Sequence, residues 1–312
     1  MAWRAFAGII PSHMPTFVWT SRRRAAAFGL GVLLGLAVAL PTLAHVALDE
    51  QVGDLSRRIQ DRPDDASLYL RRGELHRIRR EWDAALSDYA TARRLDSRMA
   101  SVDLCLGRLL LETGRPAEAR AALDRFLSRR PDHAEGLAFR ARSLEMLGDH
   151  LAAAADLTRA IERYRPPERP RPEYYLDRAR ALMAAGPTYL DEALHGLDEG
   201  LERLGEPVTL ALSAIELEVK AGRHGAALAR LDRTASRAAR KEIWLSRRAE
   251  ILERAGRLDE ARRCHEQTLE AIESLTVSRR GSAAVLDLES SARAALRRLT
   301  PEHPAPCAGV AP

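Results

Sequence analysis

Alanine returns along this chain at a fixed step of 34 residues, and this spacing limits how the chain can fold. Six alanines carry it, in two sets of three separated by a step of 40: Ala85, Ala119 and Ala153, then Ala193, Ala227 and Ala261. Glycines follow the same period, since Gly114 and Gly148 are also 34 residues apart. The stretch around Ala153 reads as two short helices joined by a turn at Gly148. A period of this length with a helix–turn–helix unit predicts a tandem helical repeat.

Length and composition agree with one repeat array. The 312 residues are enough for two globular domains. A repeat predicts instead a solenoid, in which each unit contacts only its neighbours. Aromatic residues make up only 5% of the chain, and alanine, leucine, arginine and glutamate dominate. This composition favours helices throughout, so we expect an all-α protein.

The period divides the chain into segments. We expect six units at residues 66–99, 100–133, 134–167, 172–205, 208–241 and 242–275, preceded by a lone helix within residues 45–65. The proline-rich residues 165–172 separate units one to three (66–167) from units four to six (168–275). A helix within residues 276–300 has one apolar and one charged side, which predicts a terminal cap. Residues 301–312 are expected to be disordered.

The first 44 residues predict export. Arg22, Arg23 and Arg24 precede an uncharged run over residues 25–48, and Ala44 ends a small-residue stretch suited to signal-peptidase cleavage. The run is also long enough to span a bilayer, so an uncleaved inner-membrane anchor is the alternative. Both interpretations place the repeats in the bacterial periplasm or envelope. The leader's four arginines account for four of the five net positive charges, and a near-neutral remainder predicts no nucleic-acid partner.

The units resemble the tetratricopeptide repeat family. Its motif has small residues at positions eight and twenty of each unit, matched in unit three by Ala141 and Ala153. Small residues there let two helices pack closely. The usually apolar seventh position departs from the motif in four units: Arg72, Arg140, Arg178 and Arg248. Units five and six match least well.

The resemblance implies a right-handed superhelical solenoid of about six helix–turn–helix units plus terminal capping helices. It also implies a scaffold that binds protein or peptide segments in a concave groove lined by the first helix of each unit. The candidate groove residues that follow are Leu70, Arg77, Leu104, Arg108, Arg142, Leu176, Arg180, Glu216 and Glu250.

One row of groove residues carries a charge pattern. Arg108, Arg142 and Arg180 occupy the ninth position of consecutive units, whereas Glu216 and Glu250 occupy it in the last two. A groove of one charge sign attracts the opposite charge. We therefore expect an acidic partner segment over units two to four, with its less acidic or basic end toward the two glutamates.

Two alternatives to this interpretation stay open. The arginines could be ordinary solvated residues that pair with Glu112 and Glu145, since exposed ion pairs contribute little binding energy. The same arginines could instead form a receptor for an anionic small molecule or an envelope polymer.

The sequence contains no motif for catalysis or cofactor binding. It has no phosphate-binding glycine loop, no His-Glu-x-x-His motif and no serine nucleophile elbow. Three scattered cysteines, Cys105, Cys264 and Cys307, form no disulfide framework. We therefore expect neither enzyme activity nor a cofactor or metal.

Overall fold

The structure is a computed structural model that describes residues 48–165 and 167–299. The predicted leader, the predicted C-terminal tail and Cys307 lie outside the described residues. The chain divides into two compact units, Met1–Asp54 and Leu55–Pro312. The described part of the first, residues 48–54, is helical, and this helix runs to residue 61. All other described helices belong to the second unit, and no strand occurs among the described residues.

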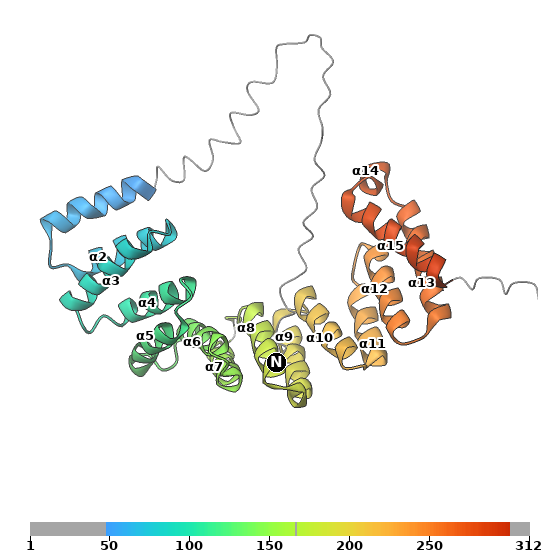
Figure 1. Ribbon diagram of the computed structural model, residues 1–312, viewed down its shortest axis with the longest axis horizontal. Coiled ribbons are helices and arrows are strands. Elements are labelled where there is room, and N and C mark those ends of the chain that lie inside the picture. Colours follow the sequence, from blue (N-terminus) through green and yellow to red (C-terminus); the bar gives the residue numbers. More distant parts are fainter. Residues whose placement is uncertain (1–47, 166, 300–312) are drawn as a thin grey trace, which may run out of the picture. The chain divides into compact units, whose positions relative to one another are not determined.

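Twelve helices of the second unit form six consecutive pairs (Figure 1). The pairs are α2 (Ala66–Ile78) with α3 (Trp82–Leu95), α4 (Ala100–Glu112) with α5 (Pro116–Arg129), α6 (Ala134–Met146) with α7 (His150–Glu162), α8 (Pro172–Ala185) with α9 (Leu190–Leu204), α10 (Val208–Lys220) with α11 (His224–Ala235), and α12 (Lys241–Arg254) with α13 (Leu258–Glu273). Each helix packs mainly against helices next to it along the chain. The predicted all-α helical repeat fold is therefore confirmed.

Three further elements interrupt or end this series. A short 3-10 helix η1 (Pro187–Tyr189) lies in the lengthened turn between α8 and α9. After α13, the four-residue α14 (Val277–Arg280) leads into α15 (Ala283–Leu299). The last helix packs on α13 and α12 and buries Val285, Ala292 and Ala295.

The periodic alanines lie where the two helices of a pair come closest. All six have at most 1% of their surface exposed. Glycine takes part in the same contact in unit two, where a Cβ added to Gly107 would lie 2.5 Å from Cγ of Leu123. Because the helix axes must approach this closely, neither position has room for a longer side chain. The 34-residue step is thus the spacing of the helix-pair contacts.

The turn inside five of the six pairs uses a left-handed backbone, and the lengthened α8–α9 turn differs. Gly114, Gly148, Gly222 and Gly256 occupy the equivalent turn position and have φ between +72° and +84°. Glycine adopts this conformation without the steric cost of a Cβ. Unit one is the exception, because Arg80 has φ of 61° at the same position. An L-residue other than glycine carries a conformational cost there.

The arginines at the seventh position lie between packed helices instead of at a solvated surface. Arg72 on α2 donates to both carboxylate oxygens of Asp88 on α3, at 2.8 and 2.7 Å, and to the hydroxyl of Ser56 at 3.1 Å. Arg178 bonds Glu199 at 3.0 Å, also across its own helix pair. The departure from the family motif thus has a physical account: a carboxylate on the second helix of the same unit accepts the charge of Arg72 and Arg178, and one on the second helix of the preceding unit, Asp232, accepts that of Arg248.

Candidate functional site

The predicted groove residues all lie on the first helices of their units. These helices, α2, α4, α6, α8, α10 and α12, are called the first-helix layer below. The layer carries Leu70 and Arg77 on α2, Leu104 and Arg108 on α4, Arg142 on α6, Leu176 and Arg180 on α8, Glu216 on α10, and Glu250 on α12. The three leucines are partly buried and pack against the core, so only part of their apolar surface is free.

The arginines of units one and two are held by carboxylates. Arg108 bonds Glu74, which is the ninth-position residue of the preceding unit. Arg77 lies 2.7 Å from Glu112 and 3.4 Å from Glu74. The hydroxyl of Tyr89 also donates to Glu74. These two arginines are therefore engaged by carboxylates of the protein itself. The pairing of Arg77 with Glu112 is the one that the first alternative interpretation above proposed.

The electrostatics of Glu74 reflect this network. Burial by itself would raise the pKa of this carboxyl, but the hydrogen bond from Tyr89 and the charges of Arg108 and Arg77 outweigh burial. The net result is a lowered pKa. Glu74 therefore stays ionised and forms ion pairs with its two arginine neighbours.

The other two members of the predicted arginine row differ from each other. Arg180 bonds Asp177 at 2.7 Å and lies 3.9 Å from Glu145. Arg142 is exposed and forms no ion pair with any residue that the structure describes. The predicted row of three equivalent cations therefore presents one free guanidinium, and this weakens the attraction expected over units two to four.

A pocket of about 610 Å³ opens in the first-helix layer between α10 and α12. We call it the α10–α12 pocket. From α10 it is lined by Thr209, Leu212, Ser213, Ile215, Glu216, Val219 and Lys220, and from α12 by Arg247, Glu250, Ile251 and Arg254. The structure thus brings together Glu216 and Glu250, the two acidic residues of the predicted groove.

The sequence analysis missed most of this pocket. The groove positions of the family are the second, fifth, ninth, twelfth and thirteenth of each unit. In unit five these are Thr209, Leu212, Glu216, Val219 and Lys220, and all five line the pocket. The sequence did hold the signal for the α10 side of this pocket. It would have been found by reading all five groove positions of unit five, and not mainly the ninth.

The pocket combines an apolar floor with a charged rim. Ile215, Val219 and Ile251 are buried beneath it. On the rim Lys220 lies 2.7 Å from Glu216, and both side chains are mostly exposed. Arg247 and Arg254 are exposed and form no ion pair within the described part of the chain. Such a pocket can accept an apolar side chain and offer a guanidinium to a nearby carboxylate.

This rim changes the expected charge of the C-terminal part of the groove. The ninth positions of units five and six are both glutamate, and by themselves they favour the basic end of a partner segment. The structure adds Lys220, Arg247 and Arg254 beside them. The expectation of a basic or less acidic end at Glu216 and Glu250 therefore loses its electrostatic basis.

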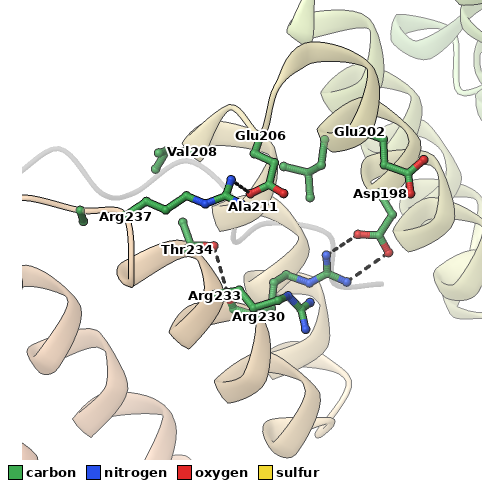
Figure 2. Close-up of a pocket in the computed structure, with 11 residues that line it drawn as sticks. Asp198, Glu202, Glu206, Val208, Ala211, Arg230, Arg233, Thr234 and Arg237 are labelled. Carbon is green, nitrogen blue, oxygen red and sulfur yellow. Dashed lines mark hydrogen bonds and ion pairs between the residues drawn. The ribbon is translucent and has the colours of Figure 1, made fainter.

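A second cavity, of about 430 Å³, lies between α9, α10 and α11 (Figure 2). Arg230, which is almost buried, reaches Asp198 and also lies 3.1 Å from Glu218. Arg237 bonds Glu206 across the cavity, as Figure 2 shows. Because Arg230 and Arg237 are each paired with a carboxylate from the preceding unit or the loop after it, we interpret these contacts as a structural junction between units four and five.

The described residues offer no other obvious chemical site. They contain no group of three or more metal-ligating side chains. None of the helices between residues 48 and 299 has the length and apolarity needed to cross a membrane. Burial raises the pKa of the Cys105 thiol to about 12, which keeps it protonated and unreactive at neutral pH. Cys264 is a free, buried thiol.

Comparisons with known proteins agree with the repeat fold. The tetratricopeptide repeat family model matches residues 104–170 and 212–268, and the second stretch covers most of units five and six. A tetratricopeptide repeat protein from Parabacteroides merdae is 14% identical, with a TM-score of 0.50, over 83% of this chain and 97% of that one. PilW, described as a widely conserved type IV pilus biogenesis factor, is 17% identical, with a TM-score of 0.51, over 67% of this chain and 94% of that one. At this identity the two structures show the fold alone. No curated protein matches the sequence.

Proposed function

We propose that this chain, an all-α repeat protein with tetratricopeptide-type units, is a scaffold that binds protein or peptide segments on its first-helix layer. The observation that carries this proposal is the α10–α12 pocket, because the five groove positions of unit five converge on it. The family's fold is typical of protein–protein interaction, which supports a binding role over catalysis. The pocket is the main contact point of the proposed groove.

The pocket chemistry suggests what it binds. An apolar side chain of the partner enters above Leu212 and Val219, where its burial contributes about 1.5–3 kcal/mol. A carboxylate next to that side chain meets Arg247 and Arg254, whose charges no described carboxylate occupies. Binding over units two to four contributes less, because Arg108 and Arg180 are already engaged by carboxylates.

Peptide selection on the purified protein tests this proposal. Peptides selected from a random library should share an apolar residue beside an acidic one. A Leu212→Arg substitution should abolish their binding, because it fills the pocket with a charge. The matched control is Leu258→Arg on α13, where the leucine is 51% exposed and lies outside the pocket. Selected peptides without a shared pattern, or equal binding to both variants, would contradict the proposal.

We also propose that the scaffold acts in the bacterial periplasm or envelope. The support is the arginine triplet before the uncharged residues 25–48. Mass spectrometry of the mature chain should find His45 at its N-terminus, or an intact leader in the inner-membrane fraction. A soluble cytoplasmic chain that retains Arg22 would refute export.

A further inference from the structure

A cleft of about 450 Å³ lies at the ends of α4 and α5, where consecutive units join. We call it the edge cleft. It is lined by Arg98, Met99, Ala100, Ser101, Leu104, Phe126, Arg129, Arg130 and His133. Its lining, all within the described residues, includes three arginines and no acidic side chain. Leu104, a predicted groove residue, therefore lines this edge as well.

The charge of the edge cleft is only partly compensated. The side chains of Arg98 and Arg130 form no ion pair with the described residues, and both are exposed. Asp96 accepts only the backbone N–H of Arg98, at 2.8 Å. Arg129 lies 3.9 Å from the buried Asp103, whose nearer partner is Arg125 at 3.0 Å. Two guanidinium groups thus remain available to a carboxylate, and arginine's planar fork suits that partner.

The wall of the edge cleft is apolar and firmly placed. Phe126 is 3% exposed, and its ring meets His133 edge-to-face with centroids 5.0 Å apart. The ring packs so tightly on α6 that a Cβ added to Gly136 would lie 2.6 Å from it. Met99 and Leu104 are partly buried beside the same cleft. This wall can take an aliphatic or aromatic side chain next to the arginines.

A neighbouring cavity, of about 320 Å³, continues this edge past unit three. It shares His133 with the edge cleft and adds Tyr164 and Tyr174 as apolar surface. Unlike the edge cleft it balances its two arginines, Arg163 and Arg171, with two acidic residues, Glu135 and Glu168. The acid-binding character is therefore confined to the edge cleft itself.

We propose that the edge cleft is a second docking surface, which binds an acidic peptide segment. The segment's carboxylates contact Arg98 and Arg130, and an apolar side chain between them packs on the exposed parts of Met99 and Leu104. The neighbouring cavity carries equal numbers of acids and arginines, so the uncompensated positive charge that a longer polyanion such as RNA would follow ends at the edge cleft. The chain beyond its leader is nearly neutral, which also favours a local acidic contact over a nucleic acid or anionic membrane.

The test uses the full chain carrying Leu212→Arg, which blocks the α10–α12 pocket, in detergent micelles. Fluorescence anisotropy then follows the binding of a fluorescein-labelled peptide of alternating glutamate and leucine. The double substitution Arg98→Glu with Arg130→Glu should weaken binding about tenfold or more, since two favourable contacts become repulsive. The control, Arg279→Glu with Arg280→Glu, changes net charge equally on the exposed α14 and should retain affinity. Circular dichroism checks that each variant folds. A second, milder variant, Arg98→Gln with Arg130→Gln, removes the two charges without reversing them and should also weaken binding.

Several results would overturn the proposal. One is equal loss of affinity in both charge-reversed variants, and another is equal binding of a peptide with glutamine in place of glutamate. A third is that an RNA oligonucleotide or phosphatidylglycerol vesicles, but not the peptide, bind through Arg98 and Arg130. Because the α10–α12 pocket would also accept a glutamate–leucine peptide, binding that remains in the Leu212→Arg chain belongs to the edge cleft. Complete loss of binding in Leu212→Arg alone would count against the edge cleft and leave the α10–α12 pocket standing, so the two failures are distinguishable.

Discussion

Arg140 and Asp156 form a two-point ion pair between the two helices of unit three. Nε and Nη2 of the arginine each donate to one carboxylate oxygen, both at 2.7 Å. Asp156 is buried, and the hydrogen bonds that Arg140 donates to this carboxylate raise the pKa of Arg140. The same geometry joins Arg72 to Asp88 in unit one. The intervening unit has Leu106 and Ala122 at the two positions, so the arginine and its acid occur together or not at all in these three units.

Removing the buried acid of this pair should destabilise the fold. We expect Asp156→Asn to lower the free energy of unfolding by about 2–3 kcal/mol, somewhat less than for a fully buried pair. The loss is smaller than for a fully buried pair because the Arg140 side chain is 22% exposed, so water can solvate the guanidinium once the carboxylate is gone. Urea denaturation measures the change.

Asp124→Asn is the matched control. Asp124 bonds the same arginine at 2.9 Å but is 47% exposed, so its loss should cost less than about 1 kcal/mol. Equal effects of the two substitutions would show that burial does not set the strength of this pair.

The alanine contact in unit three should not tolerate a larger side chain. Ala153 has no exposed surface, so Ala153→Leu must push the two helices apart and should cost about 1–3 kcal/mol. Ala155→Leu, at an exposed position of the same helix α7, should change stability by no more than about 0.5 kcal/mol. Thermal unfolding of both variants checks this, and identical melting temperatures would argue against the helix-pair contact.

The turn of unit one should gain from glycine. Arg80 is exposed and has φ of 61°, so Arg80→Gly relieves a strained backbone. We expect a stability gain of about 0.5–1 kcal/mol, since the greater freedom of glycine in the unfolded chain offsets part of the relief. The reciprocal change, Gly114→Ala, should destabilise by about 1 kcal/mol for conformational reasons alone, because open space surrounds its Cβ position. Chemical denaturation of both variants provides the test; a loss of stability in Arg80→Gly would refute it.

Acid should weaken unit one through Glu74. The pKa of this carboxyl is lowered in the folded state, so its contribution to stability is present above its ordinary value of 4.5. The contribution is lost as pH falls below that value and through the folded-state pKa. The wild-type protein should therefore lose stability on acidification in this range.

The Glu74→Gln variant isolates this effect. It should be less stable than wild type at neutral pH, and the difference should shrink as the pH falls below the ordinary pKa, because wild-type Glu74 then also loses its charge. Unfolding free energies at a series of pH values measure the difference. Glu118→Gln, at an exposed carboxyl paired with Arg115, is the control and should show a smaller change. A pH-independent difference for Glu74→Gln would contradict the assigned role.

The sequence by itself determined the repeat architecture. Ala153 and its five equivalents mark the helix-pair contacts, and Gly148 marks the turn, because steric limits at close helix contacts and left-handed turns act within one unit. Repetition then defines the neighbours of each helix, since a solenoid places adjacent units together. These local constraints leave a clear pattern in the residues.

Tertiary structure alone decided which charges are free. Arg108, Arg142 and Arg180 are equivalent in sequence, yet Arg108 reaches Glu74, Arg180 reaches Asp177, and Arg142 meets no described carboxylate. The α10–α12 pocket likewise depends on side chains from two helices separated by α11. An ion pair or a pocket depends on distances of a few ångströms between units, and a residue pattern specifies the unit but not those distances.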